Sequence, residues 1–218
     1  MTWEDLKLFT LQKMFAVNGD TIIKDDTTNP YLLSMPAVAN EALQLLSTAG
    51  RYIKKSITIR QINSGDDAVY TEDVVRIVNG LYQPYDFRVL VDDFYLFDTD
   101  DIYFLSPDGI YGKTTDFELE SESILLLDGN QTGQWTVYYN AYPEEITRDT
   151  EDDKELSLHP EVAAIIPLYM ASQLYKDDDI GQAVQYRNEF EVARNILLEN
   201  SLKQQGGKDS FVSETGWV

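Results

Sequence analysis

The pattern of apolar and polar positions changes twice along the 218-residue chain. Near both ends, apolar residues recur every three or four positions, which is typical of amphipathic helices. Between residues 56 and 142, apolar and polar residues alternate, as in Ile57-Thr58-Ile59-Arg60, which is typical of strands. The pattern therefore predicts helices, then a β-rich segment, then helices again.

Two helices are expected before the β-rich segment. The first begins at Thr2, and Asp5 occupies the position that completes a capping box. The second is expected to run from about Ser34 to about Lys54, with Pro36 in its first turn. Its predicted buried stripe consists of Val38, Ala42, Leu45, Ala49 and Tyr52.

Turn residues divide the β-rich segment into short runs. They are Ser64-Gly65-Asp66, Asn79-Gly80, Ser106-Pro107-Asp108-Gly109 and Asp128-Gly129-Asn130. Several short strands at this spacing predict a compact antiparallel β-sandwich or barrel.

Helical periodicity returns near the C-terminal end. His159 is expected to cap a helix that has Pro160 in its first position, and Pro167 is expected to kink that helix. A short break at residues 176–179 separates it from a long last helix, so the two should form an antiparallel hairpin. The expected buried stripes are Val162, Ile165, Ile166 and Tyr169 in the first helix, and Ala183, Tyr186, Phe190, Ala193 and Leu197 in the second.

The helices at the two ends of the chain carry apolar stripes that need partners. We therefore predict an α+β fold in which residues 1–55 and 148–203 form a discontinuous helical bundle. The antiparallel β-sandwich or barrel of residues 56–147 is inserted between its second and third helices. Residues 204–218 form a polar, glycine-containing tail that we expect to be disordered in the free protein and ordered on a partner.

The chain is strongly acidic, with 17 basic and 38 acidic residues and a formal net charge of −21. Because binding to nucleic acid requires basic side chains that displace counterions from phosphates, we expect no specific binding to DNA. The apolar runs are too short for a membrane span. Acidic residues stand near the N-terminus where a secretory signal would carry basic ones, which predicts assembly in a cytoplasm.

Candidate catalytic and metal-binding groups are few. The chain has no cysteine and one histidine, His159, so a zinc site lacks ligands. The segment Asp149–Asp153 begins like a calcium loop, but Lys154 and Pro160 replace the required glycine and glutamate. We therefore expect no enzyme activity, no cofactor and no metal. An acidic, tyrosine-rich β segment leaves a glycan-binding module open as an alternative.

Several motifs near the C-terminal end point to a known family. They are Leu156-Ser157-Leu158-His159-Pro160-Glu161-Val162, Ile165-Ile166-Pro167-Leu168-Tyr169-Met170-Ala171, Asp177-Asp178, Tyr186-Arg187-Asn188-Glu189-Phe190-Glu191 and Gly216-Trp217. With Val137-Tyr138-Tyr139 leading to Pro143, they resemble the head–tail adaptor (connector, or head completion) proteins of tailed bacteriophages. The resemblance covers the last third of the chain, and the second helix loosely.

The resemblance implies a structural virion protein of the phage neck, assembled in the host cytoplasm. Such adaptors form a ring, usually of twelve subunits, below the portal protein at one capsid vertex. The ring extends the DNA channel, lets DNA pass without specific binding, and supports the downstream neck or tail protein. The C-terminal segment docks onto the portal, and its matching positions here are Phe211, Gly216, Trp217 and Val218.

The inserted β segment departs from the family, whose smallest members are only helical, and its role stays open. Two other functions are compatible with the sequence. One is a glycan-binding or receptor-facing module carried on a helical stalk. The other is a tail-completion or minor capsid protein of the same kind of particle.

Overall fold

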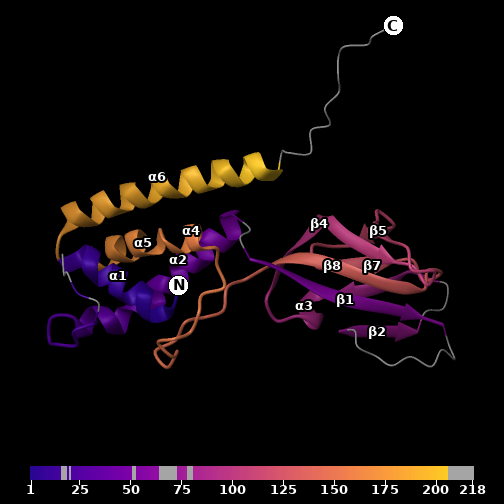
Figure 1. Cartoon of the computed structure of the whole chain (residues 1–218), viewed down its shortest axis with the longest axis horizontal. Coiled ribbons are helices and arrows are strands. Elements are labelled where there is room, and N and C mark those ends of the chain that lie inside the picture. Colours follow the sequence, from indigo (N-terminus) through magenta and orange to yellow (C-terminus); the bar gives the residue numbers. More distant parts are fainter. Residues whose placement is uncertain (16–18, 20, 51–52, 64–72, 78–80, 206–218) are drawn as a thin grey trace, which may run out of the picture. The chain divides into compact units, whose positions relative to one another are not determined.

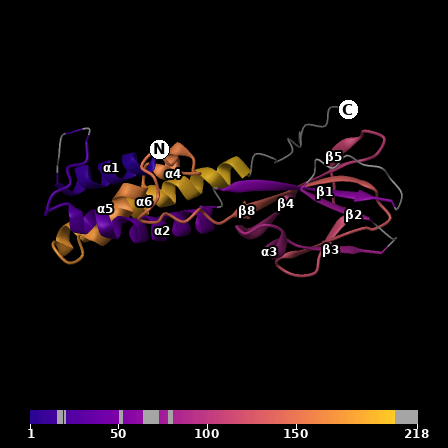
Figure 2. The same ribbon diagram turned by 90° about the horizontal axis from the view of Figure 1, so that it is seen from below.

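The computed structural model describes the chain except for residues 16–18, 20, 51–52, 64–72, 78–80 and 206–218. The described residues form a mixed α+β structure with two open sheets (Figures 1 and 2). Their contacts divide the chain into two compact units. The helical unit contains Met1–Gly50 and Glu145–Val218, and the β unit contains Arg51–Glu144.

The helical unit combines helices from both ends of the chain. They are α1 (Trp3–Phe15), α2 (Asn29–Gly50), α4 (Pro160–Ala163), α5 (Ile166–Leu174) and α6 (Ile180–Gln205). The helix α5 contacts α1, α2 and α6, and α6 lies along α5 (Figure 1). The core of the unit is therefore built around the short helix α5.

The predicted capping box at the start of α1 is confirmed. The amide of Thr2 donates to Asp5 Oδ2 at 2.9 Å, and the amide of Asp5 donates to Thr2 Oγ1 at 3.2 Å. These reciprocal bonds satisfy amides that have no partner inside a helix. The amide of Trp3 also donates to the carbonyl of Lys154 at 2.9 Å, which joins the start of α1 to the loop before α4.

The predicted limits of α2 were wrong. The helix begins at Asn29, so Pro36 lies inside it and not in its first turn. The earlier start follows from the turn before the helix, where the amides of Thr27 and Thr28 donate to Asp25 Oδ1 at 3.0 and 2.9 Å. The helix ends at Gly50, before the predicted end near Lys54.

The buried face of α2 is also displaced from the predicted stripe. Ala42 is buried as expected, but Val38 and Leu45 are half-buried and Ala49 is exposed, while Tyr52 lies outside the described residues. The buried face consists of Met35, Pro36, Ala39, Ala42, Leu43, Leu46 and Ser47. Because α2 is rich in alanine and leucine on more than one side, its periodicity alone did not identify the side that faces α5.

The predicted kinked helix is two helices. The helix is interrupted between Ala163 and Ile166, so Pro167 lies in the first turn of α5. An amide at this position has no partner inside the helix, so the proline removes no helical hydrogen bond. His159 is at the N-cap position of α4, as predicted, but its side chain makes no capping bond. The predicted stripe of Val162, Ile165, Ile166 and Tyr169 is buried.

The predicted hairpin of α5 and α6 is confirmed. The rings of Tyr169 and Phe190 meet edge to face at 5.1 Å, and those of Tyr175 and Tyr186 stack at 6.1 Å. Later residues of α5 thus pair with earlier residues of α6, which makes the helices antiparallel. The predicted stripe of α6 faces α5, since Ala183 and Phe190 are buried and Tyr186, Ala193 and Leu197 are half-buried.

The β unit contains two sheets and one short helix, α3 (Phe87–Leu90). The five-stranded sheet has the order β2 (Val74–Ile77), β1 (Lys54–Ile62), β8 (Gly133–Ala141), β4 (Phe94–Leu105) and β5 (Tyr111–Lys113). The three-stranded sheet has the order β3 (Gln83–Asp86), β7 (Ile124–Leu127) and β6 (Phe117–Leu119). Both sheets end in edge strands within the described part of the chain, so the barrel alternative was wrong.

A buried aromatic core connects the sheets of the β unit. The ring of Phe87, next to β3, lies 4.7 Å from that of Phe97 and 6.0 Å from that of Tyr139. Tyr85 on β3 hydrogen-bonds Gln61 on β1 at 3.2 Å. The prediction of purely antiparallel sheets was wrong, because β1 and β2 pair in parallel, with Ile59 opposite Val74. The long connection between these strands permits a parallel pairing that a tight turn would not.

Among the described residues, no helix has both the length and the apolar character needed to cross a membrane.

Candidate functional site

The residues predicted to bind the portal are Phe211, Gly216, Trp217 and Val218. All four lie outside the residues that the structure describes. The tail anchor therefore stays a prediction, and the candidate surfaces below come from other parts of the chain.

The helix α6 carries apolar residues on two opposite sides. One side is the stripe that packs on α5. The other side exposes Ile180 (75%), Val184 (54%), Val192 (62%) and Ile196 (55%). We call these four residues the outer face of α6.

The outer face follows from the spacing of residues in the helix. Successive residues are separated by about 100° around an α-helix, so the residue that precedes or follows a buried residue in the sequence projects from a different side of the helix. Val184 follows the buried Ala183, and Ile196 precedes the half-buried Leu197. The sequence analysis identified the buried stripe and missed this second one, although the pairs Ile180/Val184 and Val192/Ile196 are spaced four apart.

Between Ile180 and Ile196 the exposed positions of α6 carry little charge, although the exposed Asp177, Asp178 and Asp179 precede Ile180 and the exposed Glu199 follows Ile196. Of the exposed positions from Ile180 to Ile196, only Glu189 is charged, and its Oε1 accepts a hydrogen bond from Gln185 Nε2 at 3.0 Å. The chain as a whole has 38 acidic residues among 218. Charge-poor, apolar surfaces are characteristic of the centres of protein–protein interfaces.

Three charged residues of α6, Arg187, Glu191 and Arg194, lie beside the buried stripe. Glu191 pairs with Arg187 at 2.6 Å and with Arg194 at 3.1 Å. The guanidinium of Arg187 also lies over the rings of Tyr169 and Phe190, at 5.1 and 5.6 Å. These contacts hold α6 in one rotation on α5, so the outer face has a fixed direction relative to the helical unit.

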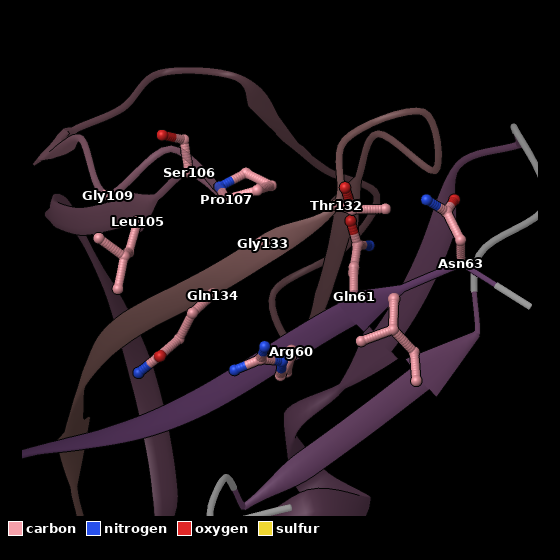
Figure 3. A pocket seen from close by; sticks show the side chains of 11 residues that line it. Arg60, Gln61, Asn63, Leu105, Ser106, Pro107, Gly109, Thr132, Gly133 and Gln134 are labelled. Carbon is pink, nitrogen blue, oxygen red and sulfur yellow. The ribbon is translucent and has the colours of Figure 1, made fainter. Parts of the chain in front are cut away.

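The β unit has a pocket of about 430 Å³ where β1 ends and β8 begins (Figure 3). In Figure 3, Ser106 and Pro107 lie on one rim, Thr132 and Asn63 lie toward the other, and Arg60 and Gln134 lie between them. Among the residues that the structure describes, the lining of the pocket includes amides, hydroxyls and one guanidinium, and no carboxylate. A pocket with this lining suits a hydrogen-bonding ligand.

Gln61 lines the same pocket but has a structural role. It is 1% exposed, and its amide can be oriented to donate to the carbonyls of Asp128 and Gln131 at 3.0 and 2.6 Å. In that orientation its oxygen accepts from the hydroxyl of Tyr85 at 3.2 Å. Burial raises the pKa of Tyr85, so this hydroxyl stays protonated and able to donate. Gln61 therefore supports the floor of the pocket.

The acidic loop before α4 does not gather ligands for a metal. Among the described residues, no three histidine, aspartate or glutamate side chains are grouped so that they could hold an ion. Asp152, in the segment that begins like a calcium loop, pairs instead with the buried Lys7 of α1.

Comparison with known proteins adds no family or homologue: no protein-family model matches the chain, and no curated protein matches it.

Proposed function

We propose that this chain is a structural protein of the bacteriophage neck, which assembles into a ring between the capsid portal and the tail. The observation that carries the proposal is the outer face of α6. It exposes four aliphatic side chains, and the exposed positions between them carry one charge, on a protein whose net charge is −21. The motifs of the α5–α6 hairpin, which resemble those of phage adaptors, give the class of assembly.

The distribution of charge favours a second copy of the chain as the partner of this face. Two copies repel each other, and the repulsion is greatest where acidic side chains meet within a Debye length of about 8 Å at physiological salt. Contact through the outer face would bury four aliphatic side chains of α6. A ring requires this face to meet a different surface of the next copy.

We further propose that the β unit is a domain inserted into a discontinuous helical domain. The division into two compact units supports this arrangement, because the helical unit contains both ends of the chain and the β unit contains its middle. The packing of α1 and α2 on α5 supports it as well.

In the proposed ring, usually of twelve copies, the acidic surface has a mechanical use. A lumen that repels phosphates lets DNA pass during packaging and ejection without specific binding. The portal protein lies above the ring and a neck or tail protein lies below it. The role is structural and involves no catalysis, cofactor or membrane.

The tail was predicted to begin at residue 204, but α6 extends to Gln205. We propose that the rest of this segment, residues 206–218, attaches the ring to the portal. Phe211 and Trp217 are large apolar side chains in a polar segment, and each contributes about 1.5–3 kcal/mol if a partner buries it fully. Repetition around a ring multiplies a weak single anchor through avidity.

Attachment of the full chain to portal-bearing heads tests the proposal. Truncation after Leu202 and Trp217→Ala should each abolish co-sedimentation with the heads, whereas Ser213→Ala in the same tail should not. Normal attachment by folded forms of the first two variants would show that the tail is not the anchor.

A further inference from the structure

The five-stranded sheet has one side that packs on the core of the β unit and a second side that is turned away from the three-stranded sheet. Side chains alternate between the two faces of a strand, and the buried Ile59, Trp135 and Val137 point to the core. Paired residues lie on the same side of a sheet, so Arg60 on β1, Gln134 on β8 and Leu105 on β4 form one row across this second side. This row lines the pocket described above.

Three tyrosines lie in or next to this row on the same face, and Tyr111 on β5 belongs to the row because it pairs with Leu105. The rings of Tyr103 and Tyr111 are stacked, with centroids 5.5 Å apart and planes 9° apart. The ring of Tyr138 meets that of Tyr103 edge to face at 6.1 Å. Tyr111 is 57% exposed, so the stack presents a ring to solvent. We call these three residues the tyrosine platform.

The platform and the pocket are close enough for one ligand to contact both. Tyr103 pairs across the sheet with Thr136, and Leu105 pairs with Gln134. The two rows are thus two residues apart, which is about 7 Å along a strand. A flat aromatic surface and a group of hydrogen-bonding side chains therefore lie side by side.

We propose that this face binds a neutral oligosaccharide. One sugar ring packs its apolar side on Tyr111, and the next places its hydroxyls among Arg60, Gln134 and Ser106 in the pocket. Amides and hydroxyls both donate and accept, as sugar hydroxyls do. The pocket, at about 430 Å³, is of the size of small-molecule sites.

The charges of this face favour a neutral sugar over nucleic acid, which also stacks on aromatic rings. The face carries the basic residues Arg60 and Lys113, which pair with Gln134 and Tyr103 across the sheet. Next to the platform, Asp101 accepts a hydrogen bond from the hydroxyl of Tyr103 at 3.4 Å and pairs with Lys54 at 3.0 Å. A polyphosphate would meet the field of a chain with net charge −21, whereas an uncharged sugar would not. The inference does not depend on the proposed ring, because it uses only residues of the β unit.

Titration of the full-length protein with maltohexaose, cellohexaose and chitohexaose tests the proposal, with oligothymidylate as the competing probe. Saturation-transfer NMR detects contact, and calorimetry gives the dissociation constant. We expect millimolar or tighter binding of at least one oligosaccharide and none of oligothymidylate. Binding of oligothymidylate alone, or of none of the four probes, would overturn the inference.

Variants locate the binding. Tyr111→Ala should weaken it roughly tenfold, which corresponds to about 1.4 kcal/mol of stacking, whereas Tyr111→Phe keeps the ring and should bind normally. Gln134→Ala should weaken binding through the pocket. The control is Tyr82→Ala, because Tyr82 is 54% exposed but lies outside the platform. Unchanged affinity in folded Tyr111→Ala and Gln134→Ala would refute the site, and none of these changes should alter ring assembly.

Discussion

Placing a charge on the outer face of α6 tests the proposed interface most directly. Val192 is 62% exposed in the single chain. Glutamate favours helix at least as well as valine does, and exposed substitutions usually change stability by less than about 0.5 kcal/mol. The variant Val192→Glu should therefore fold normally. Any loss of assembly would then come from the interface itself.

The expected loss can be worked out from exposure and charge. Full burial of a valine contributes about 1.5–3 kcal/mol, so covering the exposed part of Val192 contributes about 1–2 kcal/mol per contact. Burying an unpaired carboxylate in its place costs several kcal/mol more. A total of about 4 kcal/mol weakens each contact by roughly a thousandfold, because each 1.4 kcal/mol is a factor of ten.

Sedimentation velocity and native mass spectrometry should show a ring for the unmodified chain and single chains for Val192→Glu. The matched control is Val89→Glu in α3, because Val89 is 79% exposed and the substitution changes the net charge equally. Circular dichroism and thermal unfolding should show the same fold in all three proteins. If Val192→Glu assembles as the unmodified chain does, the outer face is not the interface and the argument from charge is wrong.

Four further predictions concern the stability of the helical unit, measured by urea unfolding. Phe190→Ala removes a fully buried ring from the contact of α6 with α5 and should cost about 3–5 kcal/mol; a cost below 1 kcal/mol would show that α6 is not packed there. Thr2→Ala should cost about 1 kcal/mol through loss of the capping bond, and no change would contradict the cap. Hydrogen bonds from Thr2 lower the pKa of Asp5, so the stabilisation by its carboxylate is present above the ordinary pKa of 3.8 and is lost as pH falls through the lowered pKa. The difference in unfolding free energy between the unmodified chain and Asp5→Ala should therefore shrink in acid. A difference that stays constant with pH would show that the charge of Asp5 does not contribute. Asn40→Ala removes two hydrogen bonds of 2.8 Å to the backbone of Ile146 and should cost about 2 kcal/mol, whereas a neutral effect would show that this loop is held otherwise.

Much of the local structure could be predicted from the sequence, because local chemistry controls it. Thr2 and Asp5 form the capping box that their spacing indicated. The stripe of α6 packs on α5 as predicted, since Phe190 and its neighbours recur at helical intervals. The β-rich segment forms strands because alternating apolar residues can cover one face of a sheet.

Contacts between distant segments were not accessible in the same way. The parallel pairing of β2 with β1 and the division of the strands into two open sheets depend on partners that no local pattern specifies. The same is true of α2, where Ala39 and Leu46 are buried and Ala49 is exposed although all three are apolar. An apolar stripe predicts that a helix has a buried side, but where apolar residues occur on several sides, the packing of the neighbouring helix determines which side is buried.

The candidate site shows this division most clearly. Ile180, Val184, Val192 and Ile196 are visible in the sequence as apolar residues at helical spacing, and so are Ala183 and Phe190. Periodicity predicts that both sets lie on a helix, but it does not say which set meets α5. Packing assigned the core to Ala183 and Phe190, because only one side of α6 can lie against its neighbours α5 and α2. The other set therefore became an exposed apolar surface.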